Sequence, residues 1–212
     1  MRNLTLCLLV TMLLVASASA DVVYENGFPN GNVNAWQINF GFTVSDTFYL
    51  PEANVVSGLI FYSWLYPGDT LLSAEVSITS AENGGTVYFD QVLSAQQGGC
   101  ARNNLGYSVC TEGLDFGGGG VNLNAGTYWI NLSNAVATND GAVYWDENSG
   151  VGCHSQGCPS QASENTIGTI PSESFVLVGG TGTSSTGTIP EPASILLLAS
   201  GLAAAGLRPR KI

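Results

Sequence analysis

Residues 57–66 read SGLIFYSWLY, and this stretch decides the fold class. Its apolar side chains occupy odd and even positions alike, as expected of a β-strand in the middle of a sheet whose faces are both covered. Around it, from Asp21 to Phe175, apolar residues recur at every second position without the 3.6-residue period of a helix. The sequence therefore predicts an all-β body, a two-sheet jelly-roll-like β-sandwich of about eight to ten strands.

Period-two patterns and turn residues divide this body into segments. Strands are expected at residues 36–44, 57–66, 72–80, 86–93, 105–109, 127–132, 141–146 and 174–178. Turns or loops rich in glycine, proline or glutamine are expected at residues 67–69, 84–85, 95–102, 117–120 and 147–171.

The two ends of the chain differ from the body. Arg2, an apolar run over residues 4–15 and the sequence Ala18-Ser19-Ala20 predict a secretory signal peptide over residues 1–20. The sandwich is expected over residues 21–178. Residues 179–188 contain only glycine, threonine and serine. This composition predicts a flexible linker ahead of the C-terminal segment 189–212.

The C-terminal segment has three parts in a fixed order. The parts are a Pro190-Glu191-Pro192 tripeptide, an apolar run over residues 193–207, and a basic tail with Arg208, Arg210 and Lys211. As a helix the run would span ~22 Å, against the ~30 Å core of a bilayer. An ordinary tail anchor is the alternative, but it requires no Pro-Glu-Pro.

This order resembles the PEP-CTERM sorting signal of Gram-negative, exopolysaccharide-producing bacteria. The resemblance implies export by the Sec machinery and a transient stay in the inner membrane through the C-terminal helix. It also implies removal of the tail by exosortase, a membrane protease-transpeptidase. The expected destination is the cell surface or the extracellular matrix, in association with exopolysaccharide and the biofilm matrix.

Charge excludes several partners of the body. Between Asp21 and Thr188 the chain keeps one basic residue, Arg102, and 15 of its 16 acidic residues, which gives a formal charge of −14. Such a surface repels nucleic acid and anionic lipid headgroups, because no basic patch can neutralise phosphates. We therefore expect no nucleic-acid partner and membrane contact only through the unprocessed C-terminal helix.

Four cysteines remain after Cys7 leaves with the signal peptide. An even number in an exported chain predicts two disulfides, and the local pairing of the three possible ones requires the least chain rearrangement. That pairing joins Cys100 to Cys110 and Cys153 to Cys158. The alternative is a zinc site that combines the cysteines with His154.

The best candidate ligand patch lies near the end of the body, at Tyr144, Trp145, Asp146, Glu147 and Asn148. Alternation places Val143 and Trp145 on one strand face and Tyr144 and Asp146 on the other. If Val143 faces the core, Trp145 is a core residue and Tyr144 is the outward aromatic, beside carboxylates and an amide. Such a ring could stack on a sugar, which makes a carbohydrate-binding module the alternative to a purely structural matrix protein.

Segments around the patch carry a second resemblance. The segments are residues 45–48 (SDTF), 67–69 (PGD), 123–132 (LNAGTYWINL), 143–150 (VYWDENSG) and 172–175 (SESF). They look like the uncharacterised β-sandwich domains often found ahead of PEP-CTERM tails. That group has no established activity to carry over.

No catalytic residue is assigned and no cofactor is expected, with a calcium site at Asp140 and Asp146 as the alternative. A hydrolase is a further alternative. Neighbouring Asp146 and Glu147 point to opposite faces of a strand, so they cannot flank one glycosidic bond. The single histidine, His154, lies between two cysteines, with no nucleophile elbow elsewhere.

Overall fold

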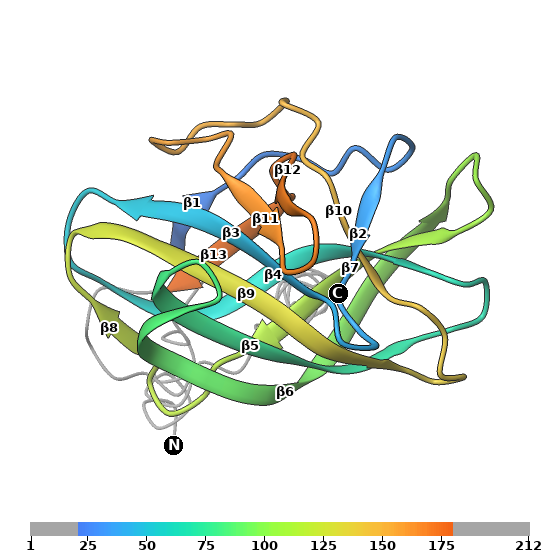
Figure 1. Cartoon of the computed structure of the whole chain (residues 1–212), viewed down its shortest axis with the longest axis horizontal. Helices are drawn as coiled ribbons and strands as arrows, with labels where there is room; N and C mark the ends of the chain where they lie inside the picture. The colour runs from blue at the N-terminus through green and yellow to red at the C-terminus, as the bar shows by residue number, and fades with distance from the viewer. Residues whose placement is uncertain (1–20, 180–212) are drawn as a thin grey trace, which may run out of the picture. The chain divides into compact units, whose positions relative to one another are not determined.

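The computed structural model describes residues 21–179, which form thirteen β-strands and no helix (Figure 1). Within this range there is accordingly no helix that is long and apolar enough to cross a membrane. The predicted signal peptide, most of the linker and the C-terminal segment lie outside the described residues. The strands are β1 (Asp21–Glu25), β2 (Ala35–Gln37), β3 (Thr43–Leu50), β4 (Asn54–Leu65), β5 (Leu71–Ala81), β6 (Gly84–Arg102), β7 (Ser108–Asp115), β8 (Val121–Leu123), β9 (Gly126–Ala137), β10 (Tyr144–Asp146), β11 (Ala162–Glu164), β12 (Gly168–Ile170) and β13 (Phe175–Gly179).

The strands form one antiparallel sheet that curls around a single core, in the order β1-β13-β4-β7-β6-β5-β9-β3-β11-β12. The short strands β8 and β10 pair with β4, and β2 pairs with β10. The long strand β6 joins the two halves of the sheet. Its first part pairs with β5 as far as Ser94, and its second part pairs with β7 from Ala95 onward. The predicted all-β fold is thus confirmed, with the two layers continuous through β6.

Strand β4 lies in the middle of its half, as residues 57–66 predicted. It is flanked by β13 and β7 and is therefore hydrogen-bonded on both sides. Leu59, Phe61 and Leu65 point into the core with no or almost no exposed surface, while Ile60 and Tyr62 on the other face are half-buried. Burying side chains of this size stabilises a fold by about 1.5–3 kcal/mol each.

The core lies between the two halves of the curled sheet. Aromatic contacts cross it: the ring of Tyr24 on β1 lies 6.0 Å from that of Phe48 on β3 and 5.5 Å from that of Phe175 on β13. Aliphatic side chains of β5 and β9, including Val76 and Ile130, fill the opposite wall without exposed surface. Because successive side chains of a strand point to opposite faces of the sheet, each strand contributes one apolar face to the same core.

The expected strand over residues 36–44 is wrong, because the chain turns in its middle. Strand β2 ends at Gln37 and β3 begins at Thr43. Between them, the amide of Phe42 donates to the carbonyl oxygen of Asn39 at 3.2 Å. Phe40 has a φ of 57° and is 66% exposed. Its apolar side chain fits the period-two pattern but lies outside the core.

The expected loop over residues 95–102 is also wrong, because it forms the second part of β6. Glutamine and glycine have low β-propensity, but pairing with β7 and the Cys100–Cys110 disulfide hold the segment extended. Similarly, the expected loop over residues 147–171 contains the hairpin of β11 and β12, and β11 pairs with β3. Strands of three residues are too short to show a period.

The remaining boundaries shift by a few residues. The expected strand over residues 105–109 begins only at Ser108, after a turn in which the Asn103 amide donates to the Tyr107 carbonyl at 2.9 Å. The β5–β6 hairpin is present, with its turn at Glu82 and Asn83 just before the expected glycines. All four glycines of residues 117–120 have positive φ, from 56° to 92°, as a turn there requires.

Candidate functional site

Strand β10 places the predicted ligand patch between β2 and β4. Tyr144 pairs with Gln37 on one side and Trp64 on the other, and Trp145 pairs with Trp36 and Ser63. Because Val143 is fully buried, alternation should send Trp145 inward, and its exposed fraction is 0%. The predicted facing of these two aromatic residues is confirmed.

Trp145 is held in the core by its ring and by its indole nitrogen. The ring meets Phe61 and Phe175 edge-on, at centroid distances of 6.1 and 5.7 Å. The indole Nε1 donates to the backbone carbonyl oxygen of Ser174 at 2.9 Å. Trp145 therefore packs the core and cannot present its ring to a ligand.

Tyr144 is half-buried and belongs to a group of aromatic rings on the outer side of β10. Its ring lies edge-on to Tyr107 at 5.7 Å, and Tyr107 lies 5.5 Å from Tyr66. Tyr66 is 46% exposed, and the nearly buried Trp64 supports Tyr107 from 5.6 Å. We call Tyr66, Tyr107 and Tyr144 the tyrosine cluster. Tyr107 was not a sequence candidate, since it lies in a turn and only the tertiary fold brings it to Tyr144.

The phenol groups of the cluster also affect one another electrostatically. Burial raises the pKa of Tyr144 above its ordinary value of 10, and the neighbouring Tyr107 and Tyr66 raise it further. Tyr144 is therefore uncharged at any physiological pH. A neutral ring with a hydroxyl group is suited to a neutral, hydroxyl-rich ligand.

The polar members of the predicted patch are not available at the surface, which corrects the sequence-based expectation. Asp146 has no exposed surface, and its carboxylate accepts the Gly31 amide at 2.8 and 3.1 Å. Glu147 is 6% exposed and accepts the Trp36 indole N–H at 3.0 Å. Asn148 is half-buried and donates to the backbone carbonyl of Asn26. The N-terminal segment after β1 covers these side chains, which the local sequence could not indicate.

Asp146 and Glu147 are two of four buried carboxyl groups that lie close enough to interact electrostatically. The others are Asp46 on β3 and Glu173 just before β13, both with no exposed surface. The backbone amide of Glu173 donates to Asp46 Oδ2 at 2.6 Å, and Ser160 Oγ donates to the other oxygen. Neither carboxyl oxygen of Glu173 has a hydrogen-bond partner among the described residues. We call these four residues the acidic cluster.

No cation compensates this cluster within the described chain. Arg102, the one arginine of residues 21–179, is exposed at the end of β6. Burial raises the pKa of Asp46 to about 7, although hydrogen bonds from Ser160 and Glu173 act to lower it. Burial likewise raises the pKa of Asp146 to about 7. The pKa of Glu173 is raised well above its ordinary value. Burial is the largest cause, and the nearby charges of Asp46, Glu147 and Asp146 add to it. The folded protein therefore holds protons here that free carboxylic acids would release.

The two residues suggested as calcium ligands differ in their exposure to solvent. Asp140 is exposed in the turn after β9, with a φ of 54°, whereas Asp146 is fully buried on β10. Across residues 21–179, no group of three or more His, Cys, Asp or Glu side chains is arranged to hold a metal ion.

Residues 188–211 match the PEP-CTERM protein-sorting motif. The match covers the tripeptide, the apolar run and the basic tail that the sequence analysis singled out, and it lies outside the described residues. No curated protein matches the chain. The PEP-CTERM motif indicates an exported protein that an exosortase processes after a transient stay in the membrane.

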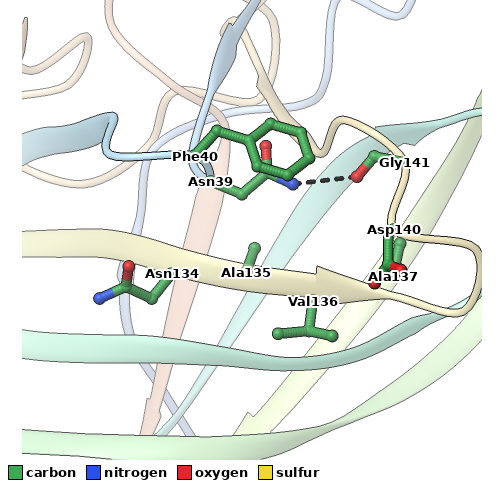
Figure 2. A pocket seen from close by; sticks show the side chains of 8 residues that line it. All are labelled: Asn39, Phe40, Asn134, Ala135, Val136, Ala137, Asp140 and Gly141. Atoms are coloured by element: carbon green, nitrogen blue, oxygen red, sulfur yellow. Dashed lines mark hydrogen bonds between the residues drawn. The ribbon is translucent and has the colours of Figure 1, made fainter.

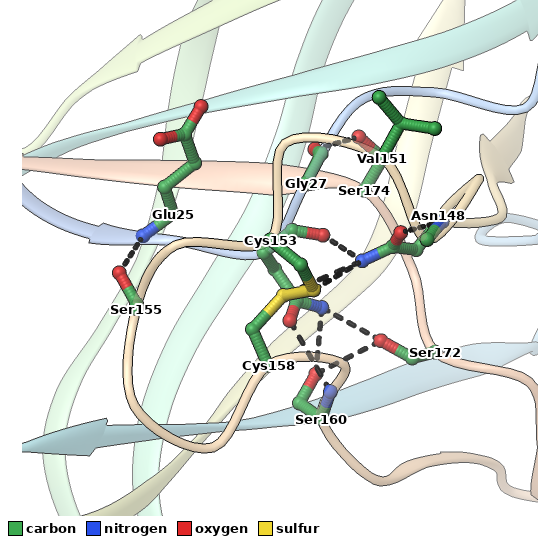
Figure 3. The surroundings of a disulfide bond; sticks show 12 residues. Glu25, Gly27, Asn148, Val151, Cys153, Ser155, Cys158, Ser160, Ser172 and Ser174 are labelled. Carbon is green, nitrogen blue, oxygen red and sulfur yellow. Dashed lines mark hydrogen bonds between the residues drawn. A yellow bond between two sulfur atoms is a disulfide. The ribbon is translucent and has the colours of Figure 1, made fainter.

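The disulfides agree with the export that the PEP-CTERM motif indicates. Cys100 and Cys110 occupy directly paired positions on β6 and β7, with their Cα atoms 4.1 Å apart. Cys153 and Cys158 close a short loop, with a Cα separation of 5.4 Å, and Asn148 Nδ2 lies 3.8 Å from each sulfur (Figure 3). Both predicted pairs are thus bonded, which leaves none of these four cysteines with a free thiolate for zinc.

Proposed function

We propose that this is a non-catalytic, exported protein of the Gram-negative cell surface or extracellular matrix that binds neutral exopolysaccharide through its tyrosine cluster. The observation that carries the proposal is the side-by-side arrangement of Tyr66, Tyr107 and Tyr144 at the surface, with ring centroids 5.5 and 5.7 Å apart. Aromatic rings of this kind stack on the apolar faces of sugars, and hydroxyl groups at their tips hydrogen-bond to sugar hydroxyls.

The negative charge of the body favours neutral exopolysaccharides over anionic ones. Residues 21–188 carry 15 acidic residues and one arginine, so an anionic polymer would be repelled along its whole length. A neutral polymer meets no such barrier. The uncharged state of Tyr144 is compatible with the same preference.

The buried position of the carboxyl groups favours binding over hydrolysis. Glycoside hydrolysis requires two carboxyl groups that reach the same glycosidic bond from opposite sides. Asp146 and Glu147 are enclosed and hydrogen-bonded to Gly31 and Trp36, and Asp46 and Glu173 have no exposed surface. A polysaccharide chain at the tyrosine cluster would therefore meet rings and hydroxyls and no accessible pair of acids.

Replacing Tyr144 with Ala is expected to weaken retardation by a neutral polysaccharide in affinity electrophoresis by tenfold or more, because the stacking ring is lost. Tyr144→Phe, which keeps the ring, should retain most of the retardation. Gels with dextran, amylose, β-glucan and galactomannan serve as probes, and urea unfolding of each variant monitors the fold. Retardation of the Tyr144→Ala variant at the wild-type level would contradict the proposed contact.

Replacing Glu191 with Ala is expected to leave the precursor unprocessed in the inner membrane, because this change alters the central residue of the PEP-CTERM tripeptide. The intact mass of the protein isolated from its host distinguishes the precursor from the processed form, because only the precursor retains the basic tail. Wild-type protein isolated with Lys211 still attached would contradict processing by an exosortase.

A further inference from the structure

A shallow pocket of about 300 Å³ lies beside the tyrosine cluster, between the turn after β2 and the end of β9 (Figure 2). Asn39, Phe40 and Gly141 line it on one side of β9, and Asp140 lies near Ala137 at the end of that strand. Residues 134–137 of β9 also line the pocket, where Asn134 and Val136 are exposed and Ala135 and Ala137 are buried.

Three of the residues that line this pocket adopt a left-handed backbone conformation. The φ angles are 57° for Phe40, 48° for Asn134 and 54° for Asp140. Asparagine and aspartate tolerate this region, but a bulky residue such as phenylalanine is an outlier there. The chain nevertheless carries an aromatic ring at this position and leaves it 66% exposed. Neither backbone preference nor core packing explains a phenylalanine here.

Hydrogen bonds hold the pocket rigid around that ring. Asn39 Nδ2 donates to the Gly141 carbonyl oxygen at 2.9 Å, and the Ala135 amide donates to the Ile38 carbonyl oxygen at 3.1 Å. Asn39 Oδ1 accepts the Val143 amide at 3.2 Å. The turn that carries Phe40 is thereby fixed to β9 and to the segment that leads into β10. A ring positioned in advance loses little conformational freedom when a ligand binds.

The pocket lies next to the tyrosine cluster at Gly141. A Cβ atom added at Gly141 would lie 3.1 Å from Cδ2 of Tyr66 and closer still to the Asp69 carboxylate, so both side chains are near this wall of the pocket. On the other side, Gln37 pairs with Tyr144 and donates from Nε2 to Asn39 Oδ1 at 3.0 Å. Two independent connections thus join Phe40 and its pocket to the outer face of β10.

We propose that the Phe40 pocket and the tyrosine cluster form one elongated site for an extended neutral polysaccharide chain. This inference rests on the proposed function and adds that the ligand is a chain spanning both parts, with one sugar stacked on Phe40 and others on the tyrosines. Asp140, which is exposed at the pocket, accepts hydrogen bonds from sugar hydroxyls. The absence of a cation among the residues that line the pocket disfavours an anionic sugar there.

The experiment compares Phe40→Asn with the wild type, since asparagine removes the ring and suits the backbone conformation at this position. Tyr88→Ala is the matched control, because Tyr88 is an exposed aromatic residue on β6 outside both parts of the site. The probe is the neutral polysaccharide that retards the wild type, together with a ladder of oligosaccharides prepared from it. Urea unfolding checks that each variant is folded.

We expect the affinity of the wild type to rise with oligosaccharide length, and Phe40→Asn to weaken binding of long chains about tenfold while leaving the shortest chains unaffected. Tyr88→Ala should behave as the wild type. If Tyr144→Ala abolishes binding but Phe40→Asn matches the Tyr88→Ala control, the elongated site is wrong and the proposed function stands. If the wild type binds no neutral polysaccharide in the panel, the proposed function fails and the elongated site fails with it.

Discussion

Raising the pH from about 4 to about 8 is expected to lower the free energy of unfolding of the domain by several kcal/mol. Most proteins lose stability on the acid side of this range, because their paired carboxylates become protonated. The opposite is expected here because the carboxyl groups of the acidic cluster are buried without a cation. The folded state holds their protons up to about pH 7 at Asp46 and Asp146, whereas the unfolded chain releases them near pH 4.

The direction follows from proton binding. Between about pH 4 and pH 7 the folded state binds more protons than the unfolded chain, so each increase in pH favours unfolding. One carboxyl group whose pKa is raised from 3.8 to about 7 contributes about 4 kcal/mol across this window. Glu112, buried on β7 and raised to about 7 by burial, adds to the effect outside the cluster. Neighbouring groups titrate together, so their contributions do not simply add.

Urea unfolding at a series of pH values measures this effect directly. Glu173→Gln removes one titrating group from the cluster at nearly constant volume and should flatten the pH dependence. Glu52→Gln makes the same substitution at an exposed position and is the matched control. A wild-type free energy of unfolding that rises steadily from pH 4 to pH 8 would contradict the uncharged cluster.

Replacing Trp145 with Ala is expected to destabilise the domain by about 3–5 kcal/mol, whereas Tyr144→Ala should cost less than about 1 kcal/mol. The difference arises because Trp145 has no exposed surface and touches Phe61 and Phe175, and because its indole N–H is bonded to Ser174. The shorter side chain would leave a cavity and an unpaired carbonyl.

The two variants also separate stability from binding. Urea unfolding at a fixed pH gives the free energy change of each, and affinity electrophoresis gives its effect on polysaccharide. We expect Trp145→Ala to affect mainly the first measurement and Tyr144→Ala mainly the second. Equal destabilisation by the two changes would contradict the facing of β10.

Period-two alternation was sufficient to predict the all-β class, the central position of β4 and the facing of Tyr144 and Trp145. These features depend on which side chains of one strand share a face, and that information is local. The second part of β6 depends instead on pairing with β7 and on a disulfide, so its glutamines and glycines indicated a loop. Non-local pairing overrides local propensity there.

The candidate site was predicted less well, for a related reason. Charged residues are ordinarily exposed, so Asp146 and Glu147 were expected at the surface. They are covered by residues far away in sequence, such as Gly31 and Trp36. Tyr107 and Phe40 lie in turns, where a sequence pattern does not indicate what the ring faces. Their place beside Tyr144 and Gly141 follows only from the arrangement of the strands.

The position of β13 is expected to make the domain resist a pull on its C-terminal side. The chain leaves the sandwich through β13, which lies between β1 and β4 and is hydrogen-bonded to both (Figure 1). A pull on the C-terminal side therefore shears two ladders at once, while an edge strand would peel away from one. Gly179 pairs with Val56 near the start of β4, and Tyr66 follows its end. A load between the C-terminal end of β13 and the tyrosine cluster would thus be carried along β4, whose 12 residues span about 40 Å.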